Sequence, residues 1–186
     1  MEAYIISGFR TAVGKAGKGG FRSTRPDDLA VALIQHLVKS TPGLENSMVD
    51  DVIVGCANPE GEQGLQIGRI IANRALGKDV PGMTVNRYCA SGLETISIAV
   101  AKIRAGMGHC FIAGGAESMS LIPMTGYKLA PNYNIASTTP DYVVGMGLTA
   151  EAVAKKFNIS RDAADAFSVR SHQRAAAAID SGKFKD

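Results

Sequence analysis

The amino-acid sequence predicts an α/β fold, and three observations lead to this prediction. Short apolar runs alternate with longer segments in which apolar residues recur at helical spacing. Glycine is frequent, with 21 residues in 186, and several glycines directly follow an apolar run. The composition, 46% hydrophobic and 20% charged with a net charge of +3, is ordinary for a globular protein. A layered domain with a largely parallel sheet accounts for these observations.

The first elements come from residues 3–55. Residues 3–7 (AYIIS) form an apolar run that ends at a glycine, which predicts a buried strand. Residues 11–25 are rich in glycine and basic residues and fit no phosphate-binding glycine register, so we expect a loop. Pro26 and two aspartates then begin a helix, since both residue types suit a first turn. Its predicted apolar stripe consists of Leu29, Leu33, Ile34, Leu37 and Val38.

The middle of the chain alternates strands and helices. Strands are expected over residues 51–55 (DVIVG), 83–86 (MTVN) and 110–113 (CFIA), which are short segments that contain apolar residues. Helices are expected over residues 64–76 and from Cys89 onward, because apolar residues recur there every three or four positions. The second of these helices is expected to bury Leu93, Ile96, Ala99, Val100 and Ile103.

The pattern changes after Ser118. Residues 120–145 contain prolines and asparagines and little periodicity, which is typical of a functional loop or lid. Helices are expected over residues 146–157 and from the N-cap Ser160 to about Ile179. The inward face of the last helix is predicted to hold Phe167, Ala175, Ala178 and Ile179.

Several classes of protein are excluded by composition. The basic residues are spread along the chain, which disfavours a nucleic-acid partner, and no apolar run is long enough to span a membrane. Cys56, Cys89 and Cys110 form an odd set without zinc-ligand spacing, so we expect no metal and a reducing compartment. The first ten residues lack the features of a secretory signal, and we expect a cytoplasmic protein.

The sharpest candidate for chemistry is Cys89, which falls where a buried strand turns into a helix. Small residues follow it, so backbone N–H groups can approach a ligand there. The positive end of the helix dipole favours a thiolate, and the N–H groups can hold an oxyanion. A buried structural cysteine is the competing interpretation, and the residues alone leave both open. His36, His109 and His172 lie in no setting that pairs with Cys89.

Two further segments were weighed as sites. Asn86 and Arg87 could bind an anion or a carbonyl, although a polar pair often closes a strand without a function. The segment 114–120 (GGAESMS) follows the last strand of the alternating region, where ligands of open α/β sheets gather. From the residues alone, a plain turn is the favoured interpretation of this segment. Cys56 and Cys110 are interpreted as structural.

Longer motifs resemble the thiolase family. They are VNRYCASGLETI around Cys89, GGAESMSLIPM downstream, and MGLTAEAVAKKFNISRDAADAFSVRSHQRA after that. GFRTAVGK and EGEQGLQIGRIIA, nearer the start, match as well, so the resemblance covers the whole chain. The NRxCxSGL form is more similar to degradative 3-ketoacyl-CoA thiolases (acetyl-CoA acyltransferases) than to biosynthetic acetoacetyl-CoA thiolases, which remain the alternative.

The resemblance implies a fold, a reaction and partners. The fold is a layered αβαβα arrangement, with residues 1–118 as the N-terminal thiolase domain and residues 119–186 as the beginning of an inserted loop domain that covers the acyl-CoA site. Cys89 matches the acyl-accepting nucleophile, whose N–H would be one oxyanion donor, and Met146 matches a residue that lines the pocket. Coenzyme A would be a co-substrate, with no permanently bound cofactor. A homodimer or homotetramer and a role in fatty acid β-oxidation are also implied.

The sequence also departs from the family pattern. The family's activating histidine lies in a GHP segment and its proton-donating second cysteine in a CxGGG segment, and neither motif occurs in these 186 residues. Glu94 and Thr95 stand where the family more often has Gln and Ala. We therefore expect an N-terminal fragment or half of a split thiolase, without the C-terminal domain and inactive alone. A non-catalytic assembly module is the alternative from another class, and a nucleotide-binding domain is disfavoured because no glycine fingerprint follows a strand.

Overall fold

The structure, a computed structural model, describes residues 2–185 in two compact units that divide after Leu129. The first unit contains α1 (Pro26–Ser40), β1 (Asp51–Gly55), α2 (Ile67–Leu76), β2 (Gly82–Val85), α3 (Ser91–Arg104) and β3 (Phe111–Gly115). The short 3₁₀ helices η1 (Asn46–Met48) and η2 (Gly61–Gln63) lie in its loops. The second unit contains α4 (Tyr133–Thr138), η3 (Pro140–Val143), α5 (Met146–Lys156) and α6 (Arg161–Asp180).

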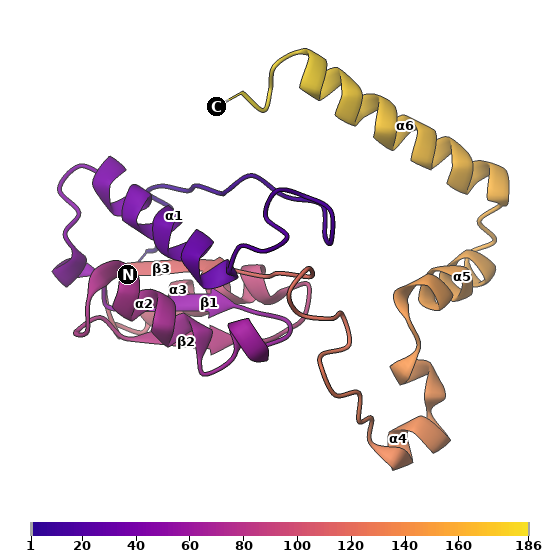
Figure 1. Cartoon of the computed structure of the whole chain (residues 1–186), viewed down its shortest axis with the longest axis horizontal. Helices are drawn as coiled ribbons and strands as arrows, with labels where there is room; N and C mark the ends of the chain where they lie inside the picture. The colour runs from indigo at the N-terminus through magenta and orange to yellow at the C-terminus, as the bar shows by residue number, and fades with distance from the viewer. Residues whose placement is uncertain (1, 186) are drawn as a thin grey trace. The chain divides into compact units, whose positions relative to one another are not determined.

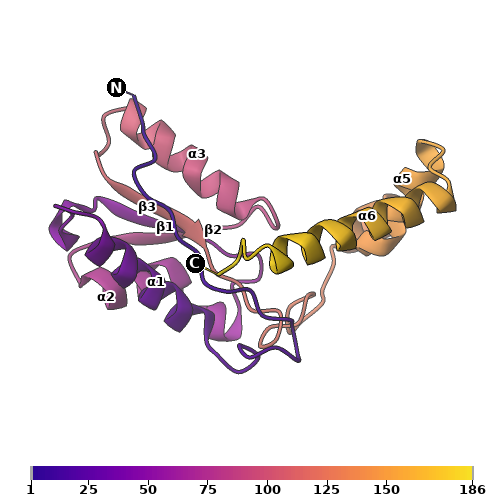
Figure 2. The same ribbon diagram turned by 90° about the horizontal axis from the view of Figure 1, so that it is seen from above.

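The sheet of the first unit has the order β2-β1-β3, and both pairs of neighbouring strands are parallel. Val52 pairs with Gly82 on one side and with Ile112 on the other. Helix α2 packs on one face with α1 beside it, and α3 covers the opposite face (Figures 1 and 2). This three-layer unit confirms the predicted α/β class. The five-layer arrangement requires a second sheet, which residues 2–185 do not contain.

The central strand β1 is buried along its whole length, because helices cover both of its faces. Val52 and Ile53 are fully buried, as are Ile67 and Ile71 of α2. Each such side chain contributes about 1.5–3 kcal/mol through the hydrophobic effect. The core of the first unit therefore holds the sheet and α2 in fixed positions. The Cys89 turn lies where β2 ends and α3 begins.

The predicted strand at residues 3–7 is wrong. This segment is not a strand, and Tyr4, Ile5 and Ile6 are 72%, 82% and 79% exposed. A strand needs a partner, and within residues 2–185 no backbone hydrogen bond joins residues 3–7 to the sheet. The apolar run was therefore insufficient to predict the element.

Two other expectations are corrected near α2 and in the loop 120–145. Helix α2 begins at Ile67 rather than at Gly64, because Leu65 and Gln66 both adopt left-handed backbone angles (φ of 51° and 61°). The loop 120–145 includes a short helix, α4, whose N-cap Asn132 accepts a hydrogen bond from the N–H of Ile135. Asparagine favours turns and also caps helices, so its presence at residue 132 does not distinguish a loop from the start of α4.

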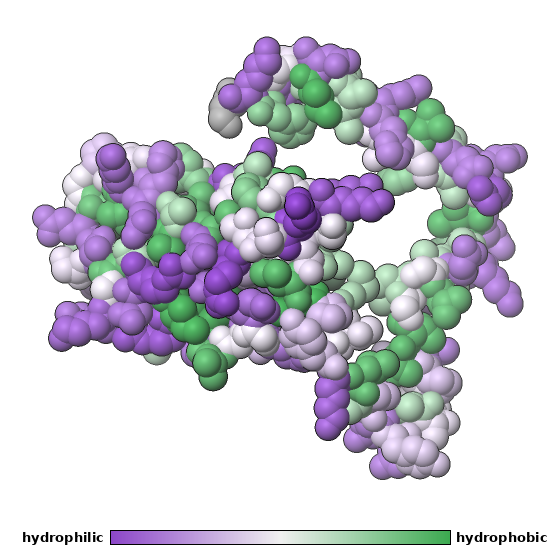
Figure 3. All heavy atoms as spheres, viewed as in Figure 1, coloured by the Kyte–Doolittle hydropathy of each residue, from purple (hydrophilic) through white to green (hydrophobic). Residues whose placement is uncertain are grey.

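Helix α6 begins as predicted, with the hydroxyl of Ser160 accepting a hydrogen bond from the N–H of Ala163 at 3.2 Å. Its predicted inward face is wrong for this chain, since Phe167 and Ile179 are each 63% exposed. Large apolar side chains are also exposed on α4 and α5, and Figure 3 shows such hydrophobic patches in green. None of the helices within residues 2–185 combines the length and apolar character needed to cross a membrane.

Candidate active site

Cys89 lies in the turn between β2 and α3, two residues before the helix begins, and its side chain is exposed. All three strands are parallel, so β1, β2 and β3 end at the same edge of the sheet as this turn. In open α/β sheets, ligands bind outside the carboxyl ends of the strands. The position predicted from the sequence is therefore at an edge where chemistry is common. An exposed thiol at this place does not fit the competing interpretation of a buried packing residue.

The turn is built around Tyr88, which has a left-handed backbone with φ of 48°. A residue with a Cβ pays roughly 1–2 kcal/mol for this conformation. Two side chains hold it: Asn86 Oδ1 accepts a hydrogen bond from the Tyr88 N–H at 2.8 Å, and the Ser91 hydroxyl donates one to the Tyr88 carbonyl at 2.6 Å. The residue directly before Cys89 is thus fixed from both ends.

Ser91 also joins the turn to the first residue of α3. It is 4% exposed, and its Oγ accepts a hydrogen bond from the N–H of Arg87 at 2.8 Å. A Cβ placed on Gly55, the last residue of β1, would lie 2.8 Å from the Ser91 Cβ. The glycine therefore allows the start of α3 to approach the end of the central strand closely.

Arg87 forms a bidentate ion pair with Glu94 in the first turn of α3. Its Nε and Nη2 lie 2.9 Å and 3.1 Å from the two carboxylate oxygens. The carboxylate raises the pKa of Arg87, so the guanidinium stays charged. The guanidinium is engaged by an internal partner, which favours the interpretation of Arg87 as a polar residue that closes the strand over that of an anion ligand.

The other two cysteines differ from Cys89 in their surroundings. Cys56 at the end of β1 is 1% exposed, and burial together with the Glu117 carboxylate raises the pKa of its thiol to about 11. Burial also raises the pKa of Cys110, with a smaller contribution from Asp50. Both thiols therefore stay protonated near neutral pH, in agreement with the structural role predicted for them.

A buried amide links the ends of β1 and β3. Gln63 of η2 is fully buried, and its Nε2 donates hydrogen bonds to Glu117 Oε1 at 2.5 Å and to the Asn58 carbonyl at 2.7 Å. Its Oε1 accepts a hydrogen bond from the Ser118 N–H at 2.5 Å. Glu117 Oε2 in turn accepts one from the Ala57 N–H at 2.6 Å. The segment 114–120 is thus a hydrogen-bonded part of this edge rather than a plain turn.

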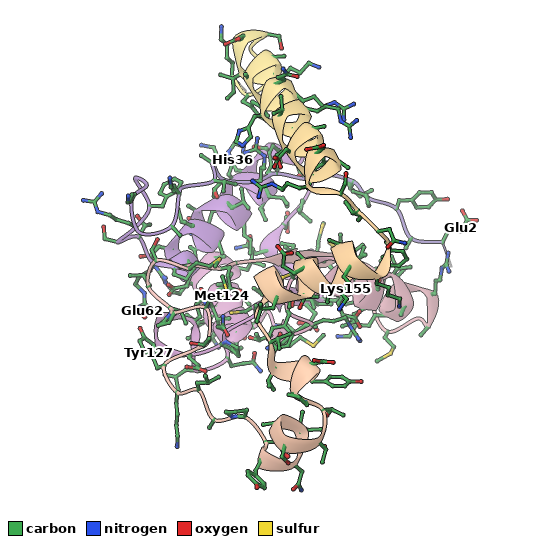
Figure 4. All side chains as sticks on the ribbon, turned by 90° about the vertical axis from the view of Figure 1, so that its right-hand side faces the viewer. Glu2, His36, Glu62, Met124, Tyr127 and Lys155 are labelled. Atoms are coloured by element: carbon green, nitrogen blue, oxygen red, sulfur yellow. The ribbon has the colours of Figure 1, made fainter. Side chains whose placement is uncertain are left out.

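The segment after Ser118 packs against η2 on the same side of the unit. The Tyr127 N–H donates a hydrogen bond to Glu60 Oε2 at 2.8 Å, and Asn58 Nδ2 donates one to the Met124 carbonyl at 3.3 Å. Figure 4 shows Glu62, Met124 and Tyr127 close together there. Residues 118–127 therefore continue the first unit beyond its last strand.

The three histidines belong to different parts of the chain. The His36 ring packs edge-on against Phe9 at 4.9 Å, His109 precedes β3 at the opposite edge of the sheet, and His172 is part of α6 in the second unit. Within residues 2–185, no hydrogen bond joins a histidine to Cys89. The expectation that none of them pairs with Cys89 stays a prediction.

Comparison with known proteins identifies the family. The family model for the thiolase N-terminal domain matches residues 3–186. The chain belongs to the thiolase family. It is 52% identical over its whole length to the 3-ketoacyl-CoA thiolase of Bacillus subtilis (strain 168) and 41% identical to 3-ketoacyl-CoA thiolase 5, peroxisomal, of Arabidopsis thaliana. It is 39% identical, over 97% of its length, to the 3-oxoadipyl-CoA/3-oxo-5,6-dehydrosuberyl-CoA thiolase of Escherichia coli (strain K12).

The thiolase chain spans about half the length of the curated relatives that it matches. It covers 47% of the Bacillus subtilis protein, 41% of the Arabidopsis thaliana protein and 49% of the Escherichia coli protein. The resemblance seen in the motifs is therefore confirmed at the level of the family.

Met146, the second residue assigned from the resemblance, begins α5 in the second unit and is 70% exposed. Together with Val153, Ile159 and Phe167, it lines an open apolar groove between α5 and α6. Cys89 belongs to the first unit and Met146 to the second. The role of Met146 stays a prediction.

Gln63 and the structural role of Asn86 were missed by the sequence analysis. Gln63 lies in a segment without apolar periodicity, and its position relative to neighbouring residues does not indicate a fully buried amide. Glu117 was within reach of prediction, because it follows the end of a parallel strand as the Cys89 turn does. For Asn86 the residues alone left open a ligand role and a polar residue that closes a strand without a function, whereas the structure uses both ends of its amide internally.

Proposed function

We propose that this chain is the N-terminal part of a 3-ketoacyl-CoA thiolase (acetyl-CoA acyltransferase) and that Cys89 is its acyl-accepting nucleophile. The observation that carries the proposal is the exposed Cys89 thiol, held on a left-handed turn at the start of α3 in a member of the thiolase family. This is the arrangement of a nucleophile elbow with cysteine in place of serine. The names of the relatives support the substrate class.

The proposed reaction has two steps. The Cys89 thiolate attacks the 3-keto carbon of a 3-ketoacyl-CoA, and the bond between carbons 2 and 3 then breaks. The acyl group stays on the sulfur as a thioester, while acetyl-CoA leaves as an enolate that takes up one proton. The thiol of a coenzyme A molecule then attacks the thioester, gives up its proton and releases the shortened acyl-CoA, which restores the Cys89 thiolate. Coenzyme A is thus a co-substrate rather than a bound cofactor.

The turn that leads into α3 supports the stabilisation of negative charge in this reaction. Negative charge develops on the carbonyl oxygen at each attack, and N–H groups at a helix start stabilise such an oxyanion. The Cys89 N–H is the proposed donor. An activating base and a proton donor are also needed, and within residues 2–185 no histidine forms a hydrogen bond with Cys89, so we expect this chain alone to be inactive.

The proposed domain organisation is an N-terminal thiolase domain over residues 1–118 and the beginning of a loop domain over residues 119–186. The end of β3 at Gly115 and the division into compact units after Leu129 bracket the proposed boundary. In the whole protein, a second sheet would complete the αβαβα layers. The second unit, including Met146, would cover the acyl-CoA.

An oligomeric state and a cellular location are also proposed for the whole protein. Unit 1 exposes large apolar side chains such as Leu65 (92%) and Leu93 (70%), which supports a homodimer or homotetramer in the whole protein. The three free cysteines support a reducing compartment, and we propose the cytoplasm and a role in fatty acid β-oxidation. Light scattering after size-exclusion chromatography tests the oligomer, and fractionation of cells tests the location.

The reaction is tested with the longest polypeptide that contains this chain. Thiolysis of acetoacetyl-CoA and of longer 3-ketoacyl-CoA substrates is measured for the natural protein, for Cys89→Ser and for Cys110→Ala as a matched control. We expect Cys89→Ser to lose activity and Cys110→Ala to keep it. Activity retained in Cys89→Ser contradicts the proposal. Cleavage of acetoacetyl-CoA alone would favour the biosynthetic type of thiolase instead.

A further inference from the structure

The amide of Asn86 connects the Cys89 turn to the end of the central strand. Its Oδ1 accepts a hydrogen bond from the Tyr88 N–H at 2.8 Å, and its Nδ2 donates one to the Ala57 carbonyl at 2.9 Å. Both ends of the side chain are therefore engaged within the protein. An amide with its acceptor and one donor occupied in this way is poorly suited to bind a substrate as a further ligand.

The partner of Asn86 is itself immobilised. The peptide N–H of Ala57 donates to Glu117 Oε2 at 2.6 Å, and Glu117 Oε1 accepts from Gln63 Nε2 at 2.5 Å. Gln63 is fully buried in the first unit. A continuous series of hydrogen bonds thus runs from a buried amide, through the ends of β3 and β1, to the residue before Cys89.

The turn needs such a support because its backbone is strained. Tyr88 has a positive φ of 48° although it is not glycine, and its side chain is 72% exposed, so packing of the ring does not hold it in place. Strained residues persist only where their surroundings over-determine them. Here the carbonyl side is fixed by Ser91, and the N–H side is fixed by Asn86.

We infer that Asn86 is a positioning residue for the Cys89 nucleophile. Its amide holds the neighbouring Tyr88 in place by bonding to the Tyr88 N–H and to the Ala57 carbonyl. The inference rests on the proposed function, because positioning matters only if Cys89 reacts. Asn86 does not touch the substrate. It keeps the sulfur at the place from which it reaches the 3-keto carbon, and a displacement of about 1 Å can reduce a reaction rate 100-fold.

The test compares Asn86→Ala, Asn86→Asp and the control Asn73→Ala in the longest polypeptide that contains this chain. Asn73 is an exposed asparagine of α2 whose side chain makes no hydrogen bond within residues 2–185. For Asn86→Ala we expect kcat to fall between about 10- and 100-fold while KM changes less than about twofold, because geometry at the sulfur is lost and acyl-CoA binding is not. Asn73→Ala is expected to keep both constants.

Asn86→Asp separates positioning from general destabilisation. Its carboxylate still accepts from the Tyr88 N–H but cannot donate to the Ala57 carbonyl, so we expect a kcat between those of the natural protein and Asn86→Ala. Hydrogen exchange of the Tyr88 amide, measured on the 186-residue chain, is expected to speed up in Asn86→Ala and to stay slow in Asn86→Asp and Asn73→Ala.

Two results overturn the inference. One is a kcat of Asn86→Ala equal to that of the natural protein. The other is a loss of kcat in Asn86→Ala that is fully accounted for by a smaller folded fraction, as measured by urea unfolding. Neither result touches the proposed function as long as Cys89→Ser is inactive. Activity in Cys89→Ser, by contrast, refutes the proposed function itself, so the two failures are distinguishable.

Discussion

The hydroxyl of Ser91 donates a hydrogen bond to the carbonyl of Tyr88 at 2.6 Å, so the first residue of α3 stabilises the strained residue that precedes Cys89. The same oxygen accepts a hydrogen bond from the Arg87 N–H. One buried side chain thereby closes the turn in both directions.

Replacing Ser91 with alanine removes both hydrogen bonds and leaves a backbone N–H without its partner. We expect the free energy of unfolding in urea to fall by about 1–3 kcal/mol. Ser97→Ala is the matched control, since Ser97 is an exposed residue of the same helix, and its change should stay within about 0.5 kcal/mol. Equal effects of the two substitutions would contradict the role assigned to the Ser91 hydroxyl.

Two glycines near the turn are expected to respond oppositely to alanine. A Cβ on Gly55 would lie 2.8 Å from the Cβ of Ser91, so Gly55→Ala forces the start of α3 outward and should cost about 1–3 kcal/mol in urea unfolding. A Cβ on Gly92 would meet nothing within 4 Å, and Gly92 is the second residue of α3. Gly92→Ala should therefore stabilise the unit by about 0.5–1 kcal/mol. A neutral Gly55→Ala would show that β1 and α3 do not pack as closely as described.

Alkylation should distinguish the three thiols. In the folded chain near neutral pH, we expect iodoacetamide to modify Cys89 first, because Cys56 is 1% exposed and its raised pKa of about 11 keeps it protonated. Cys110, whose pKa is also raised, should react slowly. Peptide mapping by mass spectrometry measures the three rates, and urea provides the control in which all three thiols become reactive. Equal slow labelling of the folded chain would instead favour the assembly module.

The Asp50 carboxylate is expected to stabilise the fold, and this stabilisation is expected to be lost in acid. Its carboxylate accepts hydrogen bonds from the N–H groups of His109 at 2.6 Å and Cys110 at 2.9 Å, and these bonds lower its pKa below the ordinary value of 3.8. The stabilisation by Asp50 is therefore complete when the pH is above its ordinary pKa of 3.8. It disappears as the pH falls through the lower pKa that Asp50 has in the folded chain.

The variant Asp50→Asn should consequently be less stable than the natural chain near neutral pH, and the difference should shrink in strong acid. Urea unfolding at a series of pH values measures this convergence. Asp79→Asn serves as the control, because the Asp79 side chain is 88% exposed and its one ion pair among residues 2–185 is with Lys78 at 3.5 Å. A constant difference between Asp50→Asn and the natural chain at every pH would contradict the prediction.

Regular elements with strong periodicity were predictable from the sequence. The β1 segment DVIVG has an apolar centre, Val52 to Val54, and is buried at every position, as expected for a central parallel strand. Helix α1 begins at Pro26, where proline and the aspartates placed it. The position of Cys89 between β2 and α3 followed from the same reasoning, because the end of one pattern and the start of the next enclose it.

The remaining features depend on contacts between residues far apart in the chain. The left-handed angles of Leu65, Gln66 and Tyr88 occur at residues other than glycine, and local preference argues against each of them. The hydrogen bond between Gln63 and Glu117 joins two loops that the sequence treats as unrelated. The apolar run at residues 3–7 shows the converse case, since hydrophobicity without a partner strand did not produce a strand.

The strand order β2-β1-β3 also has a consequence for how the first unit is made. The central strand, residues 51–55, pairs with residues 111–115, so its second neighbour is synthesised only after α2, β2 and α3. Until residue 115 has left the ribosome, the nascent chain holds an apolar strand with one side open. Closing that long loop delays folding, and this interval is when the emerging polypeptide most needs protection by chaperones.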